Sequence, residues 1–139
     1  MIKISKQTDY ALQFLIELSN LEKNELLGLR MFSTKSSISF LFLQKIARAM
    51  RKADLIIAEK GKNGGYKLKK PISKISLNDV IEAVEGPYGP TDCSKLNGIC
   101  KRSSKCTIKK GMSKINADLI KYLKKITLEN LFVENKLRI

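Results

Sequence analysis

The sequence predicts a mainly α-helical protein with one small β-hairpin, in the order of a winged helix-turn-helix, and with a long helix near the C-terminus. Three observations predict this fold. Three helical segments come first, a glycine-rich hairpin follows them, and an apolar stripe at helical spacing lies near the end of the chain. A chain of 139 residues fits one compact domain with an appended arm.

The helices of the first part follow from the spacing of their apolar residues. A first helix is indicated by Ala11, Phe14, Leu15, Leu18 and Leu21, with Ser5 or Thr8 as its N-cap. A short second helix is expected within residues 29–35. A third helix, capped by Ser39 and ending near Ala53, is expected to bury Phe42, Leu43, Ile46, Ala49 and Met50 and to expose Leu41, Gln44, Lys45 and Arg48.

The hairpin comes next. Residues 55–59 and 66–69 are typical of two strands joined by the glycine-rich turn 61–65, and Pro71 ends the second strand. Ser76 is expected to cap a short helix that runs to Val84. Residues 86–111 are predicted to form a loop, and residues 127–139 are assigned no element. The helix between them carries one apolar stripe, made up of Met112, Ile115, Leu119, Tyr122, Leu123 and Ile126.

The charge of the chain favours a polyanionic partner. The formal net charge is +14, with 27 basic and 13 acidic residues and no histidine. Such an excess attracts nucleic acid, because each neutralised phosphate releases condensed counterions. Two segments, 35–52 and 93–111, contain several basic residues and no acidic one. The alternative is a merely basic globular protein.

The helix and hairpin order gives these charges a common target. A helix fits the major groove of DNA, and a hairpin can lie beside it on the backbone or in the minor groove. The candidate DNA-binding residues are Ser39, Leu41, Gln44, Lys45 and Arg48 of the third helix and Lys60, Lys62, Asn63, Gly64 and Tyr66 of the hairpin. The alternative is a solvated helix face next to an ordinary hairpin.

Three cysteines, Cys93, Cys100 and Cys106, lie close together in the predicted loop. In a reducing compartment such clustering indicates metal or redox chemistry and not a disulfide framework. Thiolates favour iron–sulfur clusters, zinc or copper(I), and the surrounding lysines favour thiolate over thiol. The alternative is three unliganded cysteines on a surface loop.

Enzyme and membrane functions are not expected. The chain has no histidine, no nucleophile motif and no phosphate-binding loop, so we predict neither an enzyme nor a small-molecule substrate. No apolar run approaches the length of a membrane span, and the N-terminal segment does not have the pattern of a signal peptide. We therefore expect a cytoplasmic protein without a membrane partner.

Five segments, in order, resemble the winged-helix transcription regulators of the IscR/NsrR type, the Rrf-two family. The first is 8–12, in the first helix. The second is 38–56, which contains Ile38-Ser39 and Met50-Arg51-Lys52-Ala53. The third is the wing, 61–68. The segments 75–86 and 127–131 resemble the part after the wing and the C-terminal signature. The resemblance runs in register from about residue 2 to residue 131.

The resemblance implies a homodimeric bacterial regulator of double-stranded DNA. Residues 1–72 would form the DNA-binding region, 73–111 a connector helix and cysteine loop, and 112–139 a dimerisation helix and tail. Gln44 and Lys45 stand where family members contact bases, and Lys60 stands at a wing position that often holds Arg. Asp54 replaces the usual Gly after the third helix, and Asp accepts left-handed geometry better than most residues.

The cluster-binding branch of the family implies a two-iron or four-iron cluster on Cys93, Cys100 and Cys106. Lys109 occupies the position where some members have a histidine ligand. The resemblance offers Asp9 of the partner subunit as a fourth ligand, although Asp9 is equally well explained as a charge that favours the helix dipole. Glu85 is a weaker candidate. Two other possibilities stay open: a metal-free thiol regulator of the same fold, and an unregulated basic nucleic-acid binder.

Overall fold

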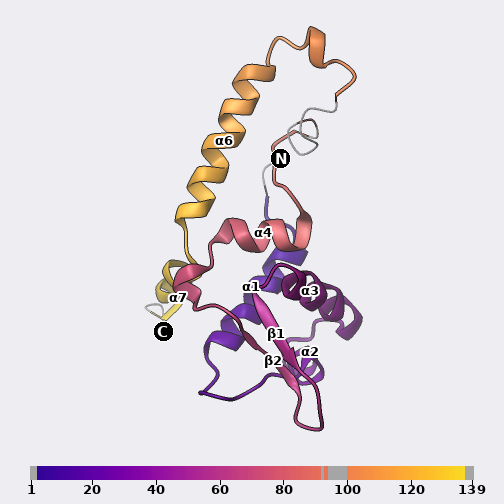
Figure 1. Cartoon of the computed structure of the whole chain (residues 1–139), viewed down its shortest axis with the longest axis vertical. Helices are drawn as coiled ribbons and strands as arrows, with labels where there is room; N and C mark the ends of the chain where they lie inside the picture. Colours follow the sequence, from indigo (N-terminus) through magenta and orange to yellow (C-terminus); the bar gives the residue numbers. More distant parts are fainter. Residues whose placement is uncertain (1–2, 92, 94–99, 137–139) are drawn as a thin grey trace.

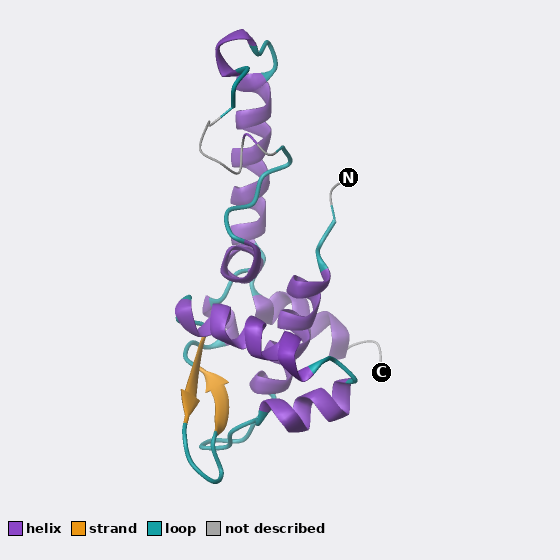
Figure 2. Cartoon of the chain, turned by 90° about the vertical axis from the view of Figure 1, so that its right-hand side faces the viewer, coloured by secondary structure: helices purple, strands orange, loops and turns teal. Residues whose placement is uncertain are grey.

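The computed structural model describes residues 3–91, 93 and 100–136. Figures 1 and 2 show a helical body that carries a small hairpin, with one long helix standing away from it as an arm. The mainly helical fold with one two-stranded antiparallel sheet confirms the predicted fold class. Within the described residues, no helix is both long enough and apolar enough to cross a membrane.

Three helices form the centre of the body: α1 (Lys6–Ser19), α2 (Leu29–Ser36) and α3 (Phe40–Lys52). Ser5 caps α1 by accepting a hydrogen bond from the Thr8 N–H, as one of the two predicted caps. The ends of these helices differ from the prediction in two details. Leu21 lies beyond the end of α1, and Ser39, although it stands at the predicted N-cap of α3, makes no side-chain capping bond.

The hydrophobic core lies between these helices and the hairpin. Phe14 contacts Phe32 and Tyr66, with ring centroids 5.1 and 6.0 Å apart. The buried side of α3 consists of Leu43, Ile46, Ala47 and Met50, all at most 2% exposed. Phe42 and Ala49, which were predicted to be buried, are only partly buried because they lie at the edge of this face.

The wing consists of β1 (Ile56–Glu59) and β2 (Gly65–Leu68), paired antiparallel with Ile56 opposite Leu68. β1 begins one residue later than predicted, because Leu55 donates its N–H to Met50 at the end of α3, and β2 begins and ends one residue earlier than predicted. A bridge between Leu27 and Tyr66 attaches the loop before α2 to the edge of β2. The wing is therefore tied to the helical body at its base.

Two residues with a left-handed backbone end the helices of this region. Ser37, after α2, has φ 61°, and Asp54, after α3, has φ 59°. The left-handed conformation predicted for Asp54 is confirmed. Its carboxylate pairs with Lys69 at 2.9 Å, and this hydrogen bond and charge lower the pKa of Asp54.

Helix α4 (Leu77–Glu85) connects the winged part to the rest of the chain. The Ser76 hydroxyl accepts from the Asp79 N–H and the Asp79 carboxylate accepts from the Ser76 N–H, which completes a capping box. At the other end, the Glu85 carboxylate accepts hydrogen bonds from the hydroxyls of Ser5 and Thr8. The end of α4 is thereby joined to the beginning of α1.

The arm is α6 (Lys109–Lys125), which begins three residues before the predicted helix and follows a short 3-10 turn, Ser103–Lys105. None of its residues is buried. The chain then returns to the body and forms α7 (Leu128–Lys136), where no element was predicted. Leu128 and Phe132 are 0% and 6% exposed and belong to the core, and Ile126 and Leu128 exchange backbone hydrogen bonds with Leu77 and Ile75.

Candidate nucleic-acid interface and cysteine segment

The exposed face of α3 carries the residues that the sequence predicted for it. Because the core side of the helix is apolar, the opposite side turns to solvent. Leu41 is 75% exposed, and Gln44, Lys45 and Arg48 are exposed as well. Ser39 is exposed just before the helix. This face offers one apolar side chain, one amide and two cations.

The tip of the wing carries a second group of exposed polar residues. Lys60, Lys62 and Asn63 lie in the turn between β1 and β2 and are exposed. Gly64 and Tyr66 are only partly exposed. A Cβ atom on Gly64 would lie 2.4 Å from the Glu59 carbonyl oxygen, and the Tyr66 ring packs on Phe14. The geometry therefore gives both residues a structural part in the wing.

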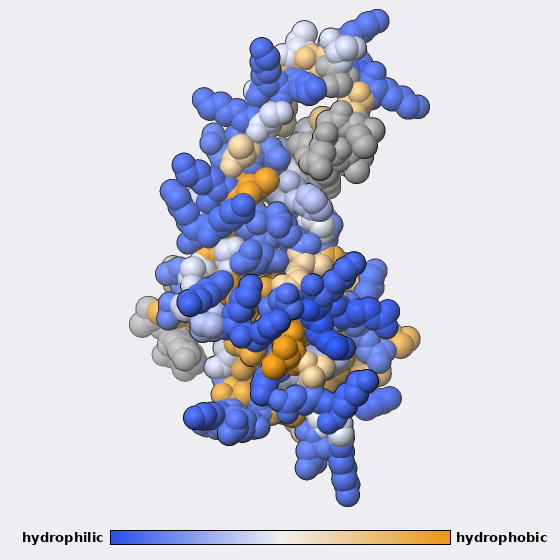
Figure 3. Space-filling model, viewed as in Figure 1, coloured by the Kyte–Doolittle hydropathy of each residue, from blue (hydrophilic) through white to orange (hydrophobic). Residues whose placement is uncertain are grey.

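The cations of these two surfaces are not used in ion pairs within the described part of the chain. The ion pairs found there join Lys35 to Glu17, Lys67 to Glu59 and Lys69 to Asp54. On the face of the molecule drawn in Figure 3, hydrophilic residues predominate, with some hydrophobic ones in the middle of the body. The cations of α3 and of the wing tip can therefore meet an anion without first breaking such a pair.

Arg30 is a candidate that sequence reasoning missed. It is exposed in the first turn of α2, and its guanidinium lies 4.3 Å from the centre of the Phe40 ring. Phe40 is the first residue of α3. The weak pattern of α2 gave no reason to single out Arg30, and the contact with Phe40 depends on how the two helices approach each other.

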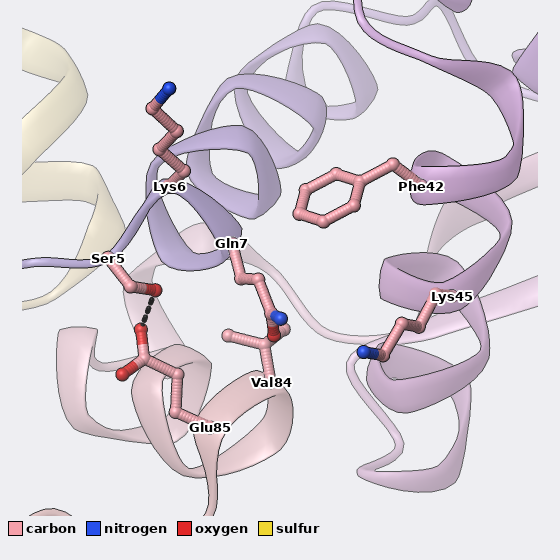
Figure 4. A pocket seen from close by; sticks show the side chains of 7 residues that line it. All are labelled: Ser5, Lys6, Gln7, Phe42, Lys45, Val84 and Glu85. Atoms are coloured by element: carbon pink, nitrogen blue, oxygen red, sulfur yellow. Dashed lines mark hydrogen bonds between the residues drawn. The ribbon is translucent and has the colours of Figure 1, made fainter.

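A shallow pocket of about 650 Å³ lies between the start of α1, α3 and the end of α4 (Figure 4). Its lining residues are Ser5, Lys6, Gln7, Phe42, Lys45, Val84 and Glu85. Figure 4 shows the Ser5–Glu85 hydrogen bond on one side of the pocket and Lys45 on the other. The pocket is thus lined both by a candidate DNA contact, Lys45, and by Glu85, the residue just before the segment that carries the cysteines.

The cysteines are unbridged, and the structure does not bring them together into a metal-binding group. Cys93 and Cys100 are partly buried and Cys106 is exposed. The sulfur of Cys93 lies 3.1 Å from the Thr91 hydroxyl. Among the described residues, no group of three or more cysteine or acidic side chains is arranged to hold a metal ion. Residues 94–99, between the first two cysteines, lie outside the described part.

The two candidate acidic ligands differ in their surroundings. Asp9 is exposed in the first turn of α1 and accepts a hydrogen bond from the Gln13 side chain at 3.2 Å. This position suits the helix dipole and is also open to another chain. The Glu85 carboxylate is engaged by Ser5 and Thr8, which leaves it less suited to a metal.

Comparisons with known proteins agree with this geometry. The Rrf2 family, described as "Iron-dependent Transcriptional regulator", matches residues 4–134. The HTH-type transcriptional regulator NsrR of Oceanobacillus iheyensis is 32% identical over 131 residues, which cover 94% of this chain and 89% of that protein.

Two solved structures have the same fold over almost the whole chain. CymR, the global cysteine regulator of B. subtilis, has a TM-score of 0.72 at 26% identity, covering 94% of this chain and 96% of CymR. IscR of T. potens has a TM-score of 0.70 at 21% identity, covering 96% and 88%. The predicted winged helix-turn-helix is thus confirmed.

Proposed function

The chain belongs to the Rrf2 family of DNA-binding transcription regulators, and we propose that its three cysteines control how its paired winged helices hold an operator. It is a regulator and not an enzyme. The observation that carries the proposal is one pocket lined both by Glu85, which immediately precedes the cysteine segment, and by Lys45 of α3. As a regulator of chromosomal DNA, it would act in the bacterial cytoplasm.

In the proposed complex, α3 enters the major groove and the wing contacts the flanking backbone. The N-terminal residues of a recognition helix reach base edges. Leu41 would contact a thymine methyl group, because that methyl is the apolar feature of the groove, and the Gln44 amide would hydrogen-bond a base. Lys45 and Arg48 would contact guanine or phosphate, and Lys60, Lys62 and Asn63 would contact the backbone.

The proposed partner of the arm is a second copy of this chain. Ile108, Ile115 and Tyr122 are 63%, 50% and 64% exposed, and they recur at heptad spacing along the arm. Met112 and Leu119 lie between them on the same stripe and are only partly covered. An exposed apolar stripe of this kind marks an interaction surface. A homodimer would also give the two recognition helices that a palindromic operator requires.

The proposed cofactor is an iron–sulfur cluster of two or four irons held by Cys93, Cys100 and Cys106. The donor set fits, because three unbridged thiols in a basic surrounding are suitable ligands for iron. Asp9 of the partner subunit is the proposed fourth ligand. A bound cluster would supply a centre that reacts with nitric oxide or oxygen.

The chain's own contacts supply a route from the cysteine segment to the DNA. Glu85 immediately precedes the segment and accepts hydrogen bonds from Ser5, which caps α1, and from Thr8 in α1. Ser5, Glu85 and Lys45 line one pocket. A displacement of the segment would therefore shift the start of α1 relative to α3, and the two states would hold DNA with different affinity.

A metal-free thiol regulator is the second candidate. It is favoured by the absence of a metal-binding group among the described residues and by the similarity to CymR. A structure of Staphylococcus aureus CymR with a TM-score of 0.68 and 26% identity, covering 94% of this chain and 95% of that one, is described as an oxidized form. In this case reversible oxidation of the cysteines would change DNA affinity. An unregulated basic binder is the third possibility.

One experiment separates the three candidate functions, which are a cluster-binding regulator, a metal-free thiol regulator and an unregulated binder. The protein is purified without oxygen and analysed for visible absorption, iron and sulfide, and its DNA affinity is measured before and after oxidation. For a cluster, we expect absorption with iron and sulfide in the wild type, its loss in Cys100→Ala, and its retention in Ser104→Ala, which changes an exposed side chain of the same segment. The DNA affinity of the wild type should change by about 5- to 150-fold, a typical range for coupled sites.

The other outcomes are equally distinct. Iron-free protein whose DNA affinity changes on oxidation, but not in Cys100→Ala, identifies the thiol regulator. Iron-free protein with constant affinity identifies the unregulated binder, and it would remove the proposed role of the cysteines.

A further inference from the structure

Arg30 is an exposed cation whose side chain is already held in place. Its guanidinium stacks on the Phe40 ring at 4.3 Å, and Phe40 begins α3. Next to Phe40, Leu41 is 75% exposed at the N-terminal end of the proposed recognition helix. We propose that Arg30 contacts a DNA phosphate and that Phe40 positions it there, so that this contact fixes how α3 enters the groove.

The stacking leaves the guanidinium free to bind an anion. The N–H groups of an arginine lie in the plane of its guanidinium. A guanidinium over an aromatic face can therefore still point these groups outward to phosphate oxygens. None of the ion pairs in the described part of the chain involves Arg30. An arginine that is free to rotate loses rotamer entropy when it becomes fixed on a ligand. The ring of Phe40 reduces this cost before DNA arrives.

The position of Arg30 points to the DNA backbone. In a helix-turn-helix, the helix before the recognition helix crosses the backbone. Arg30 lies in the first turn of this helix, α2, which contains no acidic residue and is preceded by Gly28, whose lack of a side chain leaves the first N–H groups uncapped. The positive end of the α2 dipole and the guanidinium charge would therefore attract a phosphate on the same side of the protein.

The inference rests on the proposed DNA-binding surface, so the test must separate the two. The probe is a fluorescent duplex of random sequence, about two helical turns long, titrated at several salt concentrations. Wild-type protein should bind with an affinity that falls steeply with salt. A wild-type protein that binds no duplex would overturn the DNA-binding surface itself, together with this inference.

Arg30→Gln removes the charge. We expect the slope of log K against log salt to become shallower by about 0.9, the contribution of one phosphate contact, and the affinity to fall about fivefold at physiological salt. Lys74→Gln is the matched control, because Lys74 lies on the 3-10 turn Ile72–Lys74, which packs against α7 away from this surface. It should keep the wild-type slope. A wild-type slope and affinity in Arg30→Gln would overturn the proposal.

Two further variants test the positioning role of Phe40. Arg30→Lys keeps the charge but not the planar fork, and Phe40→Leu keeps an apolar side chain but not the aromatic face. Both should retain the wild-type salt slope and bind about two- to fivefold more weakly. Melting curves establish that the variants fold. If Arg30→Gln does not fold, wild-type affinity in Arg30→Lys and Phe40→Leu overturns the inference.

Discussion

At the scale of single residues, Gly65 shows how tightly the wing is joined to the body. It begins β2 and lies against the backbone of Leu27, the residue that bridges to Tyr66. A Cβ atom at position 65 would lie 2.8 Å from the carbonyl carbon and oxygen of Leu27. Since both neighbours are backbone atoms, the contact cannot be relieved by a side-chain rotation.

We therefore expect Gly65→Ala to lower the free energy of unfolding by about 1–3 kcal/mol, the usual cost of overpacking. It should also weaken DNA binding, because the wing would move. Urea unfolding followed by circular dichroism at one protein concentration measures the first effect. The control is Gly111→Ala in α6, where no atom lies within 4 Å of the added Cβ and stability should rise by about 0.5 kcal/mol. Equal stability of the two variants would contradict the steric explanation.

The left-handed residues show what could be predicted at this scale. Asp54 was expected to accept this conformation because it replaces the glycine that the resembling family usually has after this helix, and its φ is 59°. Ser37 has the same conformation, with φ 61°, but it was not predicted. Serine carries no strong preference for this region, so the local sequence gives no signal, and the packing of α2 against α3 determines the turn.

At the scale of elements, α7 is the clearest addition to the prediction. Its core residues Leu128 and Phe132 contribute to the same core as α1 and α3, although they are the last part of the chain. Backbone hydrogen bonds of Leu77 with Ile126 and of Leu128 with Ile75 hold the start of α7 beside the start of α4. The C-terminal helix is therefore part of the winged body and not a free tail.

Phe132→Ala should consequently destabilise the whole winged body, by about 3–5 kcal/mol, because it removes a buried aromatic ring. The adjacent Val133 is 49% exposed, and Val133→Ala should change the free energy of unfolding by at most about 0.5 kcal/mol. Denaturant unfolding with a probe in the wing compares the two. If Phe132→Ala leaves the unfolding midpoint of the wing unchanged, α7 does not stabilise the DNA-binding part.

The elements that were predicted have strong local signals, and those that were missed depend on distant contacts. The period of apolar residues in α1 and α3 and the glycine-rich turn of the wing were sufficient to place these elements. The short α7 gains its partners from residues about fifty positions earlier, such as Ile75, which no local pattern shows. For the same reason, the exposed face of α3 could be predicted, but the contact of Arg30 with Phe40 could not.

At the scale of the whole molecule, the chain separates into a compact winged body and an arm with no buried residue. The described cysteines lie on the segment that leads from the end of α4 to the tip of the arm (Figure 1). The structure of one chain does not bring the described cysteines together into a metal-binding group. In the proposed site, Asp9 of the partner subunit would add a ligand from a second copy of the chain. In the proposed dimer, the arrangement of the arms would therefore govern both the metal site and the spacing of the recognition helices.

The apolar stripe of the arm can be tested by placing a charge on it. A charge in the middle of the apolar stripe would be buried without a partner in the proposed dimer, and this is costly. We expect Ile115→Glu to raise the dimer dissociation constant at least about 100-fold and to weaken operator binding, because a monomer presents one recognition helix. Sedimentation equilibrium measures the mass, and circular dichroism shows that the helix remains. Ala117→Glu adds the same charge to an exposed position off the stripe and should stay dimeric. If both variants remain dimers, the stripe is not the interface; if only Ala117→Glu dissociates, the opposite face of α6 is.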